Sequence, residues 1–200
     1  MITLAPEVCS KEVIDLVRSY GVIIAAGHSN ATYAEATAAF DGGITTATHL
    51  YNAMSPLQHR QPGLVGAAMH HPTAMASIIP DGYHVDFEAI AIAKKVMGER
   101  LYMITDAVTE TSEGPYPHQR EGDKYVSNGI LSGSALTIIK GVQNCVEKAG
   151  ISLDEALRMA SLYPAKVLGI QNTLGKIAKG FKAEMVVLND DLAIVDHVTF

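Results

Sequence analysis

Two histidines in the first quarter of the sequence are candidate ligands of one metal ion. His28 closely follows the apolar run at residues 22–26, and His49 directly follows the run at residues 44–48. If these runs are adjacent strands of a parallel sheet, both imidazoles lie at the same edge of that sheet. Imidazole suits Zn, Fe, Ni or Cu, and a catalytic zinc ion usually has three protein ligands and a water. The pair therefore predicts part of a metal site, although either histidine alone could instead be a hydrogen-bonded residue at a strand end.

Asp106 and His84 follow two further apolar runs and are candidates for catalysis. Asp106 ends the fifth such run, and a carboxylate near a metal ion can take a proton from a bound water; alternatively it caps the segment that follows. His84, within residues 81–86, could donate a hydrogen bond to a developing oxyanion or bond to loop backbone instead. The other histidines are expected in loops or the terminal strand, with structural or solvent-exposed roles: His59, His70, His71, His118 and His197.

The elements that must position these residues alternate between strand and helix. Helices are predicted from Ser10 to Gly21, over residues 31–40 and over residues 86–97, because each stretch has helical periodicity or composition and a terminal signal. This alternation is typical of a parallel sheet covered by helices, in which polar residues gather at the carboxyl ends of the strands. The strand candidates are residues 2–5, 22–26, 44–48, 74–79 and 101–105.

The second half of the chain departs from this alternation. Residues 114–129 are rich in Gly, Pro and charge and are expected to be irregular. A helix is predicted over residues 134–149, and another is expected to begin at a capping box formed by Ser152 and Glu155. Residues 183–188 and 192–198 are predicted strands of a small β element. Because an eight-stranded barrel needs about 250 residues, five strands indicate either an open sheet or a barrel that lacks three β/α units.

The composition argues against nucleic-acid and membrane partners. The net charge is −6, and no cluster of Lys and Arg forms the basic surface that nucleic acid or anionic lipid requires. No apolar run is long enough to span a bilayer, and the first residues lack signal-peptide features. Cys9 and Cys145 are far apart, which indicates neither a disulfide framework nor a thiolate zinc site. We therefore expect a cytoplasmic protein.

Taken together, the segments at the predicted strand ends resemble the N-acetylglucosamine-6-phosphate deacetylases of the amidohydrolase superfamily. Segments 163–169, 175–180 and 183–188 are similar to a tail shared across that superfamily, whereas the earlier segments are specific to the deacetylases. The resemblance covers essentially all 200 residues. The specific segments are residues 26–31 (Ala-Gly-His-Ser-Asn-Ala), 48–54 (Thr-His-Leu-Tyr-Asn-Ala-Met), 81–86 (Asp-Gly-Tyr-His-Val-Asp), 105–107 (Thr-Asp-Ala) and 131–134 (Leu-Ser-Gly-Ser).

The resemblance implies a fold and a reaction. The fold is α/β, with about the last five units of a TIM (β/α)8 barrel over residues 1–172 and strands of a small β domain over residues 173–200. The reaction is metal-dependent hydrolysis of the acetamide of N-acetylglucosamine-6-phosphate to glucosamine-6-phosphate and acetate. His28 and His49 match metal ligands. Asp106 matches the carboxylate that acts first as base and then as acid.

The resemblance also implies how the substrate is held. Zinc is the first choice for the divalent metal ion, with Fe, Co, Ni or Mn as alternatives. Arg60 matches an arginine that reaches the phosphate site of the neighbouring subunit in a homodimer, and its guanidinium fork suits a phosphate. The remaining positions that match substrate contacts are His84, Asn52, the backbone of Ala53, Leu131, Ser132 and Gly133.

One feature of that family is missing from the sequence. The family's third metal ligand is a glutamate in a His-Leu-Glu-Gly-Pro segment of an earlier strand, and these 200 residues contain no such segment. Glu7 aligns with a different family position. We therefore expect a C-terminal portion of the enzyme that binds metal weakly and hydrolyses little by itself. The alternatives are an amidohydrolase that acts on another amide, and a non-catalytic fragment that pairs with another chain.

Overall fold

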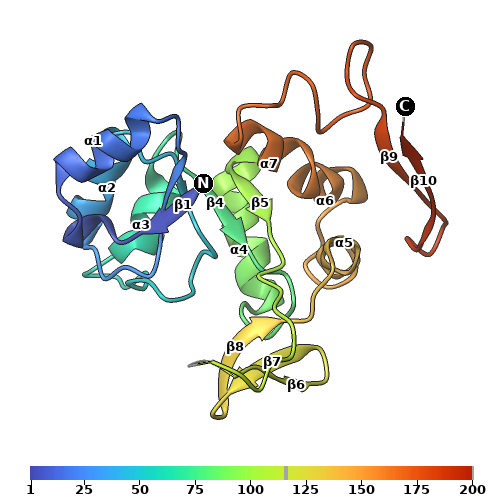
Figure 1. Cartoon of the computed structure of the whole chain (residues 1–200), viewed down its shortest axis with the longest axis horizontal. Coiled ribbons are helices and arrows are strands. Elements are labelled where there is room, and N and C mark those ends of the chain that lie inside the picture. Colours follow the sequence, from blue (N-terminus) through green and yellow to red (C-terminus); the bar gives the residue numbers. More distant parts are fainter. Residues whose placement is uncertain (115–116, 200) are drawn as a thin grey trace. The chain divides into compact units, whose positions relative to one another are not determined.

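A computed structural model describes residues 1–114 and 117–199, and the chain divides into two compact units (Figure 1). The first unit comprises residues 1–78 and 92–102, and the second comprises residues 79–91 and the chain from residue 103 onward. Each unit is described by itself. The predicted division at residues 172 and 173 is a different one and stays a prediction.

A five-stranded sheet contains all five predicted strands, which confirms the α/β class. Its strands lie in the order β1-β2-β3-β4-β5, so strands that are consecutive in the sequence are neighbours, as in a (β/α) barrel. The pairs β1–β2, β2–β3 and β3–β4 are parallel. The strands are β1 (Ile2–Leu4), β2 (Ile24–Ala26), β3 (Thr46–Ala47), β4 (Met75–Ile78) and β5 (Leu101–Met103).

Small side chains fill the centre of the sheet. Ala25 and Ala26 of β2, Ala47 of β3 and Ala76 of β4 are fully buried, although successive residues of a strand point to opposite faces. Both faces of the sheet are therefore covered, as is usual for parallel strands. Each strand has only two to four residues, and neighbouring strands pair in register. The loops that follow the strands therefore begin close together in space.

Three helices begin within two residues of their predicted starts. Helix α1 (Lys11–Ser19) follows Ser10, whose hydroxyl accepts a hydrogen bond from Val13 N–H. Helix α2 (Tyr33–Asp41) has a capping box, in which the Thr32 hydroxyl accepts from Glu35 N–H and the Glu35 carboxylate accepts from Thr32 N–H. The predicted helix over residues 86–97 is α4 (Phe87–Met97).

Helix α3 (Gly63–His70) is the one crossover helix that the sequence leaves undefined. Gly63 through Met69 are all buried, so the helix has no polar face and shows no amphipathic periodicity. His70 is the last residue of this helix, and the expectation that it lies in a loop is wrong. No helix of the described residues is long and apolar enough to cross a membrane.

The second unit contains a three-stranded antiparallel sheet that the sequence does not predict. The sheet is formed by β6 (Gln119–Glu121), β7 (Lys124–Ser127) and β8 (Ile130–Ser134). Residues 119–129 are therefore largely regular, and the predicted helix over 134–149 begins only at Ile138 because Ser134 belongs to β8. Asn128 and Gly129 both have positive φ between β7 and β8. Asn-Gly is the usual sequence signal for such a two-residue hairpin turn.

Three helices and a two-stranded ribbon complete the second unit. They are α5 (Ile138–Glu147), α6 (Leu153–Ala160), α7 (Leu162–Val167), β9 (Glu184–Leu188) and β10 (Ile194–Thr199), and the two strands confirm the predicted β element. The predicted capping box is wrong, because the Ser152 side chain makes no capping hydrogen bond. The carboxylate of Glu155 instead accepts hydrogen bonds from the Tyr163 hydroxyl at 2.7 Å and from Arg158 at 3.1 Å.

Arg100 connects the segment before β5 to the end of α3. Its guanidinium group donates to the backbone carbonyl oxygens of Ala68 at 3.0 Å, Met69 at 2.9 Å and Ala74 at 2.8 Å. These carbonyls lie at the end of α3 and just before β4. One side chain therefore joins three consecutive parts of the first unit.

We expect Arg100→Met to lower the free energy of unfolding by about 1–3 kcal/mol, because part-buried carbonyl oxygens lose a charged donor. Urea unfolding followed by circular dichroism measures this change. Lys95→Met, which removes an exposed cation from α4, is the control and should change stability by less than about 0.5 kcal/mol. Equal effects of the two substitutions would contradict the connecting role of Arg100.

Candidate functional site

The imidazoles of His28 and His49 meet at the ends of β2 and β3. Their Nε2 atoms are 2.9 Å apart, and the rings lie at 74° to each other. Two Zn–N bonds of about 2.0–2.1 Å that enclose an angle of roughly 90–110° place the nitrogens about 2.9–3.4 Å apart. The two rings therefore have the spacing of a pair of ligands on one metal ion, although a single Nε2–H···Nε2 hydrogen bond would also account for it.

The backbone at both histidines is held in an unusual conformation. The φ angle is +49° at His28 and +32° at His49, a region that residues other than glycine rarely adopt. Asp106 in the second unit shares this feature, with a φ of +50°. Such strain persists where surrounding contacts enforce it, and it is found preferentially at functional sites. Part of the enforcement at His49 is a 2.8 Å hydrogen bond from its N–H to the Ser77 hydroxyl.

Gly27 lets the ends of β2 and β3 approach each other. A Cβ atom at this position would lie 2.2 Å from Cγ2 of Thr48 and 3.0 Å from Cγ2 of Thr3. A side chain there would fit only if the side chains of Thr48 and Thr3 moved. Glycine directly before His28 therefore permits the close strand approach on which the histidine pair depends.

Glu7 anchors the loop that follows His28. One oxygen of its carboxylate accepts a hydrogen bond from the Ser29 hydroxyl, and the other accepts from Asn30 N–H, both at 2.6 Å. Ser29 is almost fully buried. Both carboxylate oxygens thus support the backbone on the C-terminal side of His28, a positioning role that the sequence alone does not reveal.

The predicted phosphate-binding residues lie beside this loop. Ser29 N–H donates to the Ala53 carbonyl oxygen, and Ser55 N–H donates to the Ser29 carbonyl oxygen, each at 3.0 Å. The Asn52 amide donates to the carbonyl oxygens of His49 at 3.4 Å and Leu50 at 3.3 Å. These contacts hold Asn52 and Ala53 next to the histidine pair within the first unit.

Arg60 lies at the tip of a tight turn. The backbone groups of Gln58 and Gln61 exchange two hydrogen bonds, of 3.1 and 3.2 Å, which close the turn around His59 and Arg60. Both tip residues are exposed. The turn therefore presents the guanidinium group to solvent instead of packing it against its own unit.

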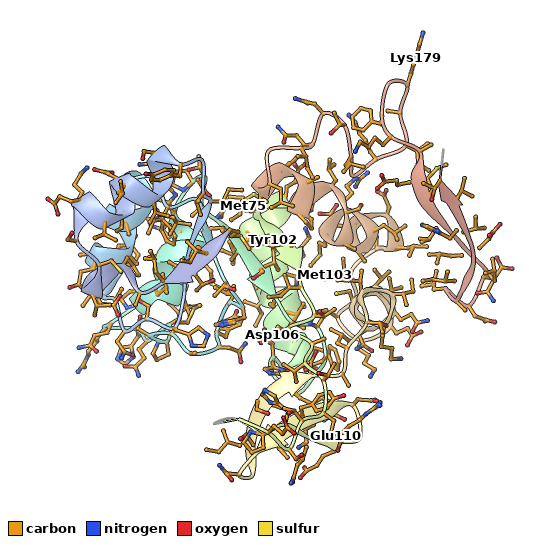
Figure 2. All side chains as sticks on the ribbon, viewed as in Figure 1. Met75, Tyr102, Met103, Asp106, Glu110 and Lys179 are labelled. Atoms are coloured by element: carbon orange, nitrogen blue, oxygen red, sulfur yellow. The ribbon has the colours of Figure 1, made fainter. Side chains whose placement is uncertain are left out.

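Asp106 lies just beyond β5, where the chain enters the three-stranded sheet (Figure 2). Its carbonyl oxygen accepts a hydrogen bond from Ser134 N–H at 3.1 Å, and the Ser134 hydroxyl donates to the carbonyl oxygen of Thr105. Ser134 of β8 thus holds the backbone on both sides of the Thr105–Asp106 peptide, while the Asp106 residue remains exposed. An exposed carboxylate on a restrained backbone is available to exchange protons with a substrate.

The predicted substrate-lining segment, Leu131, Ser132 and Gly133, belongs to β8. The Ser132 hydroxyl lies 2.8 Å from Nδ1 of His118, which the sequence treats only as a loop residue. His118 forms an isolated bridge with Thr111, so it does lie outside the regular strands.

His84 forms a tight pair with Asp81. Nδ1 of His84 lies 2.6 Å from one carboxylate oxygen, and the other oxygen accepts from Tyr83 N–H at 2.9 Å and His84 N–H at 2.8 Å. Burial alone would raise the pKa of Asp81, but the hydrogen bonds from His84 and Tyr83 outweigh it and lower that pKa. The carboxylate of Asp81 is therefore ionised at neutral pH.

The predicted residues fall into two groups. The first unit brings His28 and His49 together with Asn52 and Ala53 and carries Arg60 on its turn, whereas the second unit carries Asp106, His84 and the segment in β8. Among the described residues no group of three or more His, Cys, Asp or Glu side chains is arranged to hold a metal ion. The histidine pair fits two positions of a metal site, as its nitrogen donors and their spacing indicate.

Comparisons with known proteins place these residues in a family. The model of the Amidohydrolase family matches residues 6–199. N-acetylglucosamine-6-phosphate deacetylase of Haemophilus influenzae is 37% identical over 195 residues, with 92% of this chain and 51% of the relative covered. N-acetylgalactosamine-6-phosphate deacetylase of Escherichia coli O157:H7 is 35% identical over 203 residues, with 97% and 54% covered. The chain spans about half the length of the curated relatives that it matches.

Solved structures of deacetylases have the same fold as this chain over nearly its whole length. N-acetylglucosamine-6-phosphate deacetylase from Pasteurella multocida superposes with a TM-score of 0.94 at 38% identity, over 99% of this chain and 54% of that one. A mutant of the corresponding Mycobacterium smegmatis enzyme, in complex with N-acetyl-D-glucosamine-6-phosphate, superposes with a TM-score of 0.90 at 31% identity, over 100% and 56%. Since the family model spans nearly the whole sequence and the folds agree this closely, the chain belongs to the amidohydrolase family.

Proposed function

We propose that this chain carries the catalytic carboxylate and two metal ligands of an N-acetylglucosamine-6-phosphate deacetylase. The observation that supports it best is the convergence of the Nε2 atoms of His28 and His49 at 2.9 Å. The names of relatives at 35–37% identity support the substrate class, an acetylated amino-sugar phosphate. The products are the free amino-sugar phosphate and acetate.

The roles in the reaction follow from the chemistry of each group. A divalent metal ion held by His28 and His49, with zinc as the first choice and Fe, Co, Ni or Mn as alternatives, would supply Lewis acidity to the acetamide carbonyl and to water. Asp106 takes the proton of the attacking water as general base. The C–N bond breaks only when the amine leaves protonated, so Asp106 returns that proton to nitrogen.

Substrate recognition falls to residues outside the metal pair. Asn52 and the backbone of Ala53 hold the sugar phosphate, and the β8 segment of Leu131, Ser132 and Gly133 lines the sugar. Arg60, exposed on its turn, reaches the phosphate bound by the neighbouring subunit of a homodimer, where a planar guanidinium group matches phosphate oxygens. A cytoplasmic location, expected from the cysteine usage, stays a prediction.

The test of this function is acetate release by the product of the complete gene. We expect kcat/KM for N-acetylglucosamine-6-phosphate to exceed that for unphosphorylated N-acetylglucosamine, with the galactosamine epimer as a further comparison. Equal turnover with and without the phosphate would contradict the proposed substrate. Faster hydrolysis of another amide would favour a different amidohydrolase, and absence of any hydrolysis would favour a non-catalytic pairing role. The 200-residue chain alone should be slow, because the histidine pair supplies only two ligands.

Metal affinity tests the histidine pair without an activity assay. We expect the chain to bind Co²⁺ or Zn²⁺ weakly, and His28→Ala or His49→Ala to weaken binding by at least roughly 100-fold, since loss of a ligand should exceed the 10–100-fold cost of losing an outer-shell partner. Isothermal titration calorimetry measures the affinities. His59→Ala, at an exposed turn, is the control. Unchanged metal affinity in both variants would show that the two histidines are not metal ligands.

Substitution of the carboxylate separates catalysis from metal binding. We expect Asp106→Asn to lower kcat by about 10²–10⁴-fold in the product of the complete gene, because an amide cannot accept and return the proton. Metal affinity should stay within about threefold of the wild-type value. Glu110→Gln, at an exposed acid of the same segment, should leave kcat unchanged. Near-normal kcat in Asp106→Asn would contradict the assignment.

The role of Arg60 in phosphate binding is tested by comparing substrates with and without the phosphate. We expect Arg60→Gln to lower kcat/KM for the phosphorylated substrate by about 10–100-fold, which corresponds to one charge-assisted interaction of about 1.5–3 kcal/mol. Turnover of the unphosphorylated sugar should not change. Lys11→Gln, at an exposed cation of α1, is the control. Equal losses for both sugars would show that Arg60 acts on the fold and not on the phosphate.

A further inference from the structure

The pair formed by Asp81 and His84 is nearly fully buried and joined by several hydrogen bonds. Asp81 carries three hydrogen bonds on two oxygens, and its side chain is 2% exposed against 8% for that of His84. Both oxygens act as acceptors, since the two backbone groups are donors and the carboxylate is ionised. Nδ1 of His84 must therefore carry the proton that lies between ring and carboxylate.

This arrangement determines which nitrogen of His84 remains for another molecule. With Nδ1–H directed at Asp81, Nε2 is the ring atom left to contact a ligand. In the neutral ring Nε2 bears a lone pair and accepts a hydrogen bond, and it becomes a donor only when the ring is protonated. A ligand with a hydroxyl or amide N–H group therefore fits the neutral ring, whereas a carbonyl oxygen fits the protonated one.

We propose that Asp81 is a positioning residue that holds the proton of His84 on Nδ1 and thereby presents Nε2 to the substrate. The effect of Asp81 on catalysis rests on the proposed deacetylase function. The position of the proton on His84 is independent of that function. A carboxylate that orients a histidine in this way supports the ring even though it never contacts the substrate.

The loop around the pair is itself held in place. The Asn144 amide of α5 donates a buried 2.9 Å hydrogen bond to the carbonyl oxygen of Pro80, directly before Asp81. Gly82 has a φ of +79°, and a Cβ atom there would lie 2.7 Å from the Phe87 ring. The hydrogen bond at Pro80 therefore fixes the backbone directly before the carboxylate, and glycine at position 82 lets the next residue lie against the Phe87 ring.

Asp81→Asn is the informative substitution because it keeps the shape and removes one acceptor. The new amide oxygen can accept from the two backbone N–H groups or from the ring, but not from both sides. Two hydrogen bonds from the backbone stabilise the folded protein more than one hydrogen bond from the ring, because each contributes about 1 kcal/mol. The amide NH2 should then face Nδ1, which must become an acceptor, so the proton moves to Nε2.

Nitrogen-15 NMR of the histidine rings in the 200-residue chain tests this directly. Samples are made alkaline enough to leave the rings neutral, and His84→Gln identifies the His84 signals. We expect Nδ1–H in the wild type and Nε2–H in Asp81→Asn. Asp86→Asn is the matched control, because Asp86 caps Glu88 N–H at 3.0 Å in the same loop and should leave the His84 ring unchanged.

Several outcomes would overturn the proposal. An Nε2–H ring in the wild type does so by itself, even if the variant fails to fold, and so does an unchanged ring in a folded Asp81→Asn. In the product of the complete gene we expect Asp81→Asn to lower kcat by about 100-fold or more with a smaller change in KM. Normal kcat with a shifted proton would overturn the catalytic part. A wild type that lacks deacetylase activity but has Nδ1–H would count against the proposed function and leave the proton assignment intact.

Discussion

The close approach of the ends of β2 and β3 is the constraint on which the candidate metal site depends. Gly27 has no side chain because Thr48 and Thr3 occupy the space that a Cβ would need. The register pairs Ala26 of β2 with Ala47 of β3, so His28 and His49 follow their strands at equivalent heights. A larger residue at Gly27 would collide with the side chains of Thr48 and Thr3, and Gly27 and Thr48 directly precede the two histidines in the sequence.

Carboxylates that the sequence does not mark as functional support the residues that it does. Glu7 uses both oxygens on the loop after His28, and Asp81 uses both oxygens on His84 and its backbone. Hydrogen bonds to a charged group are stronger than those between neutral groups, which helps to maintain backbone conformations that are costly in isolation. The same loops can therefore carry reactive side chains and remain ordered.

The main features of the fold can be predicted from the sequence. Five apolar runs separated by helical periodicity predict the parallel sheet, and its strand order follows from the rule that consecutive strands are usually neighbours. Helix α3 is not predicted because Gly63 through Met69 are all buried and leave no amphipathic pattern. The strands β6 to β8 are not predicted because they are short and their burial does not alternate from one residue to the next. The Asn128-Gly129 turn was the available signal for that hairpin.

The sequence by itself determined the chemical types at the strand ends, two imidazoles and a carboxylate after the fifth strand, and it placed an arginine in the segment after the third strand. Only the tertiary structure decided that the two Nε2 atoms meet, that His28, His49 and Asp106 are among the residues with positive φ, and that Asp81 rather than solvent holds Nδ1 of His84. The physical reason is that side-chain direction and hydrogen-bond partners depend on backbone angles and on residues distant in the sequence. Local patterns of hydrophobicity and charge predict neither side-chain direction nor hydrogen-bond partners.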